Sequence, residues 1–206
     1  MTLDFSSQLH FVWALLPEIA LCAWGMGVLV AGVSGRNRPG GGGGADGSAL
    51  RSGANLGWAA LVGILVAALL NGWLYTVQEV GNTSMIAVDR FRLFANWVFL
   101  IAAALTILIS FSYVARQRLQ IGEFYGLILL STAGMMFMAG ARDLMVVFLG
   151  LEVMSIAVYA LTAFNRRDRK SAEAGLKYFL LGAFATGFFL YGIALVYGAT
   201  GSTNVT

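Results

Sequence analysis

The chain has 206 residues, of which 59% are hydrophobic and 11% are charged, whereas charged residues make up about a quarter of a typical soluble domain. This composition excludes an ordinary soluble domain and predicts an all-α integral membrane protein whose surroundings are the lipid bilayer. The net charge of +3 does not indicate a nucleic-acid partner, because nearly all of the thirteen Lys and Arg residues stand at the ends and connections of apolar runs.

Six apolar runs are long enough to cross a hydrocarbon core about 30 Å thick as helices. The first contains Pro17 and Glu18 in its opening turns, where proline costs a helix little and the helix dipole favours an acidic side chain. Glu18 is therefore mainly a structural candidate, with a functional role as the secondary interpretation. Ala23, Gly27 and Ala31 recur every four positions and suit close packing against another helix. The expected spans are residues 11–33, 56–77, 93–113, 124–141, 144–164 and 172–197.

Residues 34–55 contain five consecutive glycines and predict a flexible connection, because a phosphate-binding loop would need a preceding strand and a following Lys-Ser or Lys-Thr. The connections after spans one, three and five carry nine Lys and Arg residues, and those after spans two and four carry three. The positive-inside rule then places the first group, with residues 34–55, in the cytoplasm and both termini outside. The three on the other side are Arg90, Arg92 and Arg142.

The fifth span carries one charged residue within its apolar run. Glu152 lies nine residues after Asp143, which at 1.5 Å per residue puts its carboxyl group about 14 Å into the bilayer core. A charge at that depth costs roughly 2.5 to 3.5 kcal/mol on insertion scales, so it needs a partner or a function. Glu152 is therefore the first candidate for a functional residue.

The sixth span carries the second candidate, Lys177, for which two interpretations stay open. Glu173 stands four residues earlier, in the favourable order for a helical ion pair, and the lysine would then reach back to the surface. Alternatively, Lys177 approaches Glu152, and its positive charge decides whether the carboxyl group holds a proton. The second arrangement is what a proton relay requires.

The sequence gives little support for a cofactor on this chain. One cysteine, Cys22, and one histidine, His10, cannot build a zinc, haem or iron–sulfur site between them. A nicotinamide site would need a strand, a G-x-G-x-x-G turn and a downstream acidic residue, and that motif does not occur. Quinone binding stays open, although the tryptophans near span ends have an ordinary interfacial explanation.

Two long stretches carry a resemblance to a known family. They are LGLEVMSIAVYAL at residues 149–161 and RRDRKSAEAGLKYFLLGAFATGFFLYGIALVYGATGST at residues 166–203, supported by LLPEIAL at 15–21 and GEFYGLILLSTAGMMFMAGARDL at 122–144. The chain resembles subunit N of the bacterial NADH-quinone oxidoreductase, the proton-pumping respiratory complex I. The KYFLLG and LYGIALVYGATGST strings favour subunit N over the related pumping subunits.

The resemblance implies the start of an antiporter-like membrane-arm subunit, with Glu152 and Lys177 as proton-pathway residues and Glu18 and Glu173 as secondary candidates. It also implies other membrane-arm subunits as partners, a bacterial plasma (inner) membrane, and NADH, FMN, iron–sulfur clusters and quinone in other subunits. A cation/proton antiporter component and a structural membrane spacer remain alternatives.

One departure from the family concerns length. Family members continue through many further helices, including interrupted ones with buried lysines, whereas this sequence stops at Thr206. We therefore expect an N-terminal portion of a longer protein, which holds the leading helices and the front half of one proton route.

Overall fold

The computed structural model describes residues 2–4, 12–36, 45–76, 78–80, 85–117 and 121–205. Within these ranges six helices are long and apolar enough to cross a membrane, which confirms the predicted all-α membrane fold. They are α2 (Leu16–Arg36), α3 (Ala45–Leu74), α4 (Arg90–Gln117), α5 (Ile121–Ala139), α6 (Leu144–Thr162) and α7 (Arg169–Thr200). A parallel pair of short strands, β1 (Thr2–Asp4) and β2 (Gln78–Val80), is the small addition to the all-α expectation.

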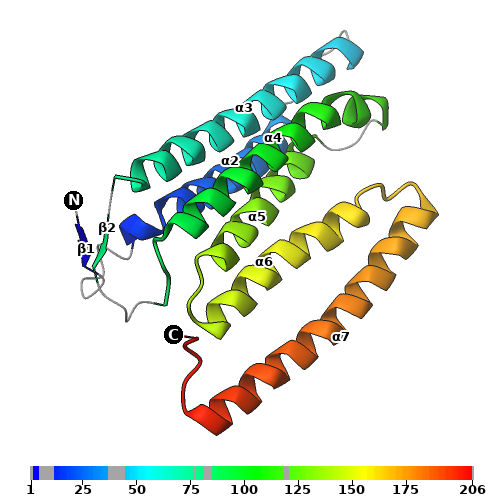
Figure 1. Cartoon of the computed structure of the whole chain (residues 1–206). Helices are drawn as coiled ribbons and strands as arrows, with labels where there is room; N and C mark the ends of the chain where they lie inside the picture. Colours follow the sequence, from blue (N-terminus) through cyan, green and yellow to red (C-terminus); the bar gives the residue numbers. More distant parts are fainter. Residues whose placement is uncertain are drawn as a thin grey trace.

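The helices form a bundle of four with a hairpin attached to one side (Figure 1). Helices α2, α3, α4 and α5 pack on one another, α6 lies along α5, and the substantial contacts of α7 are with α6. The shared core contains side chains from all four bundle helices, among them Leu21, Ile64, Leu100 and Leu129. Helix α7 is consequently exposed along most of its length within this chain.

Glycines set the closest helix contacts. A Cβ atom built on Gly32 of α2 would lie 2.9 Å from the Cα of Gly122 in α5, so these backbones touch. A Cβ on Gly134 of α5 would lie 2.8 Å from the carbonyl oxygen of Gly150 in α6. Contacts of this kind let helices approach closely in a bilayer, where packing rather than water exclusion drives association.

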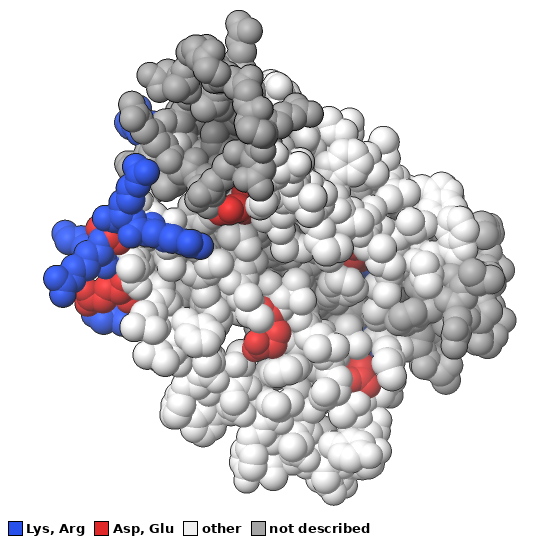
Figure 2. All heavy atoms as spheres, turned by 180° about the vertical axis from the view of Figure 1, so that it is seen from behind, with Lys and Arg blue, Asp and Glu red and all other residues white. Residues whose placement is uncertain are grey.

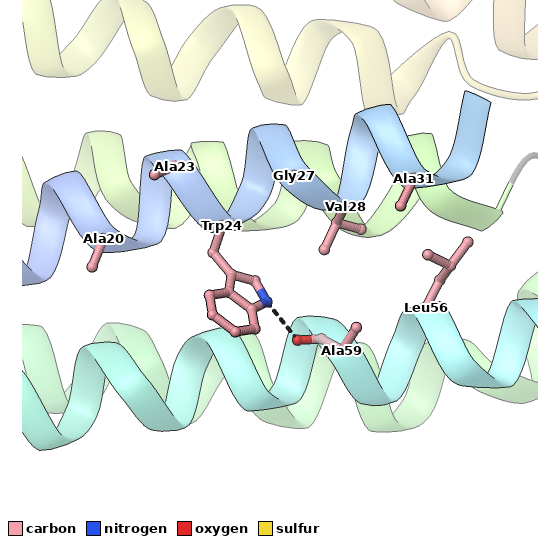
Figure 3. A pocket seen from close by; sticks show the side chains of 8 residues that line it. All are labelled: Ala20, Ala23, Trp24, Gly27, Val28, Ala31, Leu56 and Ala59. Carbon is pink, nitrogen blue, oxygen red and sulfur yellow. Dashed lines mark hydrogen bonds between the residues drawn. The ribbon is translucent and has the colours of Figure 1, made fainter. Parts of the chain in front are cut away.

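The small residues Ala23, Gly27 and Ala31 are not part of that packing. They are exposed, and a Cβ on Gly27 would meet no atom within 4 Å. They line an apolar groove of about 530 Å³ between α2 and α3, which Trp24 crosses by donating a hydrogen bond to the carbonyl oxygen of Ala59 (Figure 3). The face that packs on α5 is the neighbouring one.

The connection expected at residues 34–55 is largely helical where the structure describes it. Helix α2 continues to Arg36 and α3 begins at Ala45, before the apolar run expected from residue 56. The reason is that a helix needs backbone hydrogen bonds rather than apolar side chains, and residues 45–54 include Ala, Leu and Arg, which favour helix. The five glycines at 40–44 lie outside the described residues, as does His10.

The chain segments at one end of the bundle are joined by backbone hydrogen bonds. The segment before α4 meets the segment before α6 through an isolated bridge between Ile86 and Ala141. Gly201, with a φ of 72°, ends α7 and turns the chain so that the amide of Val205 donates to the carbonyl oxygen of Arg142. The end of α7 is thereby tied to the start of α6.

Candidate functional site

Helix α6 places Glu152 at its middle because its start is fixed by Asp143. The Asp143 carboxylate accepts a hydrogen bond from the amide of Met145 at 2.8 Å and caps the helix, as expected for an N-cap residue. The other carboxylate oxygen accepts from the hydroxyl of Thr203 at 2.7 Å. Both oxygens of Asp143 are thus occupied in a structural role, which leaves Glu152 as the acid without an assigned task on this helix.

Glu152 lies on the face of α6 that meets α7. Phe148, four residues earlier, packs against Phe189 of α7 with ring centroids 6.3 Å apart. Tyr159, seven residues later, packs against Tyr178 of α7 at 4.9 Å. Because residues at spacings of four and seven share one side of a helix, Glu152 falls between two aromatic contacts on that side.

One oxygen of the Glu152 carboxyl group is shielded from solvent and has no hydrogen-bond partner. A buried carboxyl oxygen without a partner is costly in an apolar environment, so such a group is either protonated, hydrated or paired in the working state. Glu18 has such an oxygen too, but it is also paired with an arginine, whereas no cation contacts Glu152 in the described part of the structure.

Lys177 does not pair with Glu152 in this structure. Its ammonium group contacts the carboxylate of Glu173 at 2.6 Å, and its side chain is 74% exposed. A Cβ on Gly182 would overlap the Tyr159 hydroxyl, so Gly182 lies opposite Tyr159. Tyr159 is seven residues, about 10.5 Å, from Glu152, and Lys177 lies five residues, about 7.5 Å, before Gly182 in the direction away from Glu152, so the two residues are roughly 18 Å apart along the helices. A lysine side chain is too short to cover that distance, so direct contact between the two charges requires movement of α7.

The structure reveals a second polar cluster that involves Glu18. Its carboxylate accepts a hydrogen bond from the Arg92 guanidinium group at 2.7 Å, and both side chains are essentially inaccessible. The amide of Asn96 reaches the same oxygen at 3.4 Å and donates to the side-chain oxygen of Asn71 at 3.0 Å. This cluster joins α2, α3 and α4 at one end of the bundle.

Sequence reasoning treated Arg92 as a charge in a polar connection, and the structure instead buries it in the first turn of α4. The sequence does contain a signal for this cluster, because its polar residues lie at similar depths in their apolar runs. Asn71 is near the end of one run and Asn96 is near the start of the next, so both lie at the end of the bundle that also contains Glu18. An amide inside an apolar span usually has a polar partner at the same depth.

No group of three or more His, Cys, Asp or Glu residues in the described part of the chain is placed to hold a metal ion. The candidate residues from the sequence therefore fall into two places, Glu152 with the Glu173–Lys177 pair at α6 and α7, and Glu18 in its cluster with Arg92.

The six bilayer-length helices of the described residues define a multi-pass membrane protein. The profile of the family described as NADH:quinone oxidoreductase/Mrp antiporter, TM matches residues 141–206, which include α6 and α7. The chain belongs to the family of NADH-quinone oxidoreductase subunit N and matches its N-terminal part, which confirms the resemblance carried by the sequence.

Two curated relatives illustrate the extent of the match. Subunit N of Trichlorobacter lovleyi is 45% identical over 193 residues, which are 93% of this chain and 37% of the relative. Subunit N 2 of Koribacter versatilis is 41% identical over 202 residues, with 93% of this chain and 38% of the relative covered. The chain thus spans somewhat more than a third of the length of these relatives.

Solved structures agree with the sequence comparison. A chain of respiratory complex I from Thermus thermophilus with bound aureothin superposes with a TM-score of 0.67 at 30% identity, over 91% of this chain and 38% of that one. A chain of the membrane-bound sulfane sulfur reductase, an archaeal respiratory membrane complex, gives 0.69 at 25% identity, over 96% and 39%.

Proposed function

We propose that the chain forms part of a proton-translocating membrane subunit of an NADH:quinone oxidoreductase. Proton uptake and release at Glu152 would be coupled to electron transfer from NADH to quinone. The observation that carries this proposal is the Glu152 carboxyl group, which lies mid-helix at the α6–α7 contact with one oxygen buried and unpaired. Membership of the subunit N family supports the proposed coupling to NADH and quinone, because the curated relatives are named as subunits of an NADH-quinone oxidoreductase.

The redox chemistry belongs to other subunits in this proposal. NADH, FMN, iron–sulfur clusters and quinone would be bound there, and this chain would contact further membrane-arm subunits through its exposed apolar helices. We place the protein in the bacterial plasma membrane, with the basic end of the bundle in the cytoplasm and both ends of this segment outside. On the face seen in Figure 2 most of the visible Lys and Arg side chains lie at one end of the molecule, which supports that orientation.

Lys177 and Glu173 complete the proposed site. Lys177 contacts Glu173 in the described structure, and no cation contacts Glu152. A movement of α7 that separates Lys177 from Glu173 and brings it toward Glu152 would place a positive charge beside the carboxyl group and favour release of its proton. Proton release at Glu152 would thus be coupled to the position of α7.

The test is the Glu152→Gln substitution in the full-length subunit within the assembled complex. Glutamine keeps the size and a polar group but cannot ionise, so we expect fewer protons moved for each electron pair passed from NADH to quinone. Proton translocation and NADH oxidation are measured together in sealed vesicles. An unchanged ratio of protons to electrons would assign the chain a spacer role and refute the proposal.

A cation/proton antiporter component is the second candidate, favoured by the matching family, whose description joins NADH:quinone oxidoreductase with the Mrp antiporter. The same vesicles discriminate the two functions. Proton movement driven by a sodium gradient in the absence of NADH would support an antiporter, whereas movement that requires NADH and quinone would support the respiratory complex.

A further inference from the structure

The Arg92 guanidinium group is a junction between three chain segments. One of its terminal nitrogens donates to the carbonyl oxygen of Ala14 at 2.8 Å and to the Glu18 carboxylate at 2.7 Å. The other donates to the carbonyl oxygen of Ala87 at 2.8 Å. We call Ala14, Glu18, Ala87 and Arg92, together with Gly140 described next, the Arg92 junction. It fixes the start of α2 and the segment before α4 to one side chain.

Gly140 brings the connection between α5 and α6 to the same point. A Cβ atom on Gly140 would lie 2.6 Å from Cδ of Arg92 and 2.7 Å from its Nε, so only glycine lets the backbone rest against this side chain. The carbonyl oxygen of Gly140 also accepts from the amide of Ala87 at 2.8 Å. Ala87 therefore links the two residues: its carbonyl oxygen accepts a hydrogen bond from Arg92, and its amide donates one to Gly140.

The segment fixed in this way leads directly into α6. The amide of Arg142 donates to the carbonyl oxygen of Met85 at 2.8 Å, and Asp143 then caps the helix. Glu152 follows nine residues later, about 13.5 Å along a helix whose backbone is rigid. A displacement at the start of α6 is consequently carried to the level of Glu152.

We propose that Arg92 is a positioning residue for Glu152, which it controls through Gly140 and the start of α6 without touching it. This inference rests on the proposed function. A buried ion pair is weak support for stability, because apolar residues of similar size often serve as well, and its better attested use is to fix register. In this chain the ion pair would fix the position of α6 along its axis, and with it the level at which Glu152 lies beside α7.

The experiment uses the full-length subunit in the assembled complex and compares two ways of disturbing the junction. Gly140→Ala keeps every charge and pushes a methyl group against Arg92. Glu18→Gln combined with Arg92→Met removes both charges together, so that neither is left buried and unpaired. Arg90→Met is the matched control, because Arg90 is exposed in the same helical turn as Arg92. Glu152→Gln is the reference for lost proton movement.

We expect both junction variants to assemble and oxidise NADH, but to move fewer protons per electron pair, toward the value of Glu152→Gln. Arg90→Met should keep the normal ratio. A merely structural role would lower the amount of assembled complex and leave the ratio unchanged, which would overturn the inference. Loss of assembly in both variants would likewise assign the junction to folding and overturn it.

The outcomes also separate this inference from the proposed function. A reduced ratio in Glu152→Gln with normal ratios in both junction variants refutes only the positioning role of Arg92. A normal ratio in Glu152→Gln refutes the role of Glu152 itself, and with it the need to position that residue.

Discussion

Glu18 and Glu152 differ in their charged partners. Glu18 faces a guanidinium group at 2.7 Å within a cluster of two asparagines, so its negative charge is balanced inside the protein, although its second oxygen has no hydrogen-bond partner. Glu152 is half-buried, also has one shielded oxygen without a partner, and makes no ion pair in the described structure. The counter-charge, and not the unpaired oxygen, is therefore what distinguishes the two acids.

The role of Lys177 is tested by separating it from its partner. Lys177→Ala removes the movable charge, and we expect a lower ratio of protons to electrons in the assembled complex. Glu173→Gln leaves the lysine in place but removes the group that contacts it, and because exposed ion pairs contribute little to stability, we expect normal assembly and a smaller loss of the ratio than in Lys177→Ala. Proton and electron fluxes are measured in the same vesicles. Equal losses in both variants would make the pair, and not the lysine alone, the functional unit.

The sequence identified Glu152 and Lys177 as candidates because each is a charge inside an apolar run, and that property is local. It did not identify Arg92, because hydropathy places an arginine at the edge of a span in the aqueous connection. Burial of Arg92 depends on Glu18, Asn71 and Asn96 meeting at one depth from three helices, which no local pattern contains. The distance between Glu152 and Lys177 likewise depends on how α7 rests on α6.

At the scale of elements, the closest helix contacts in this chain occur at glycines. Gly32 and Gly122 let α2 and α5 touch, whereas Gly27, five residues before Gly32, faces the open groove. The sequence predicted that α2 has a small-residue face suited to packing, but the contact with α5 uses a different set of small residues. Spacing alone does not show which of two glycine faces meets a neighbour.

That difference predicts unequal effects of two matched substitutions in α2. Gly32→Ala forces a methyl group toward the Gly122 backbone, and overpacking of this kind typically costs about 1–3 kcal/mol. Gly27→Ala meets no atom within 4 Å in this chain and gains helix propensity, so it should be neutral or slightly stabilising. The midpoint of thermal unfolding of the purified full-length subunit measures both. Equal destabilisation would contradict the packing described for α2 and α5.

The apolar runs predicted the existence of all six helices, and the structure shows that α3, α4 and α7 extend beyond their expected spans, whereas α6 stays within its own. Helix α3 begins at Ala45, where the sequence is polar and glycine-containing. Hydropathy marks the portion of a helix that sits in lipid, while the hydrogen-bonded backbone continues into water wherever the residues permit. Boundaries at the aqueous ends are therefore the part of the fold that the sequence predicts least well.

At the scale of the whole molecule, the structure removes one exposed cation from the side of the membrane that the sequence showed to be the less basic. Exposed basic side chains occur in the last turn of α4 (Arg116) and at the connection between α6 and α7 (Arg166, Arg167, Arg169 and Lys170). At the other end Arg92 is neutralised inside the protein by Glu18, so it is not a free charge facing the aqueous phase. Discounting Arg92 strengthens the positive-inside argument for placing the basic end in the cytoplasm.

The orientation gives a direct labelling prediction for the intact bacterial cell. Cys22 is first replaced by alanine. A single cysteine is then introduced by Arg167→Cys in the basic connection between α6 and α7, or by Arg90→Cys at the opposite end of the bundle. Both positions are exposed. A thiol reagent that cannot cross the membrane should label Arg90→Cys from outside and Arg167→Cys only after the membrane is opened, because the basic connection stays with the cytoplasmic surface. Mass measurement of the purified subunit reads the labelling. The reverse pattern would invert the topology.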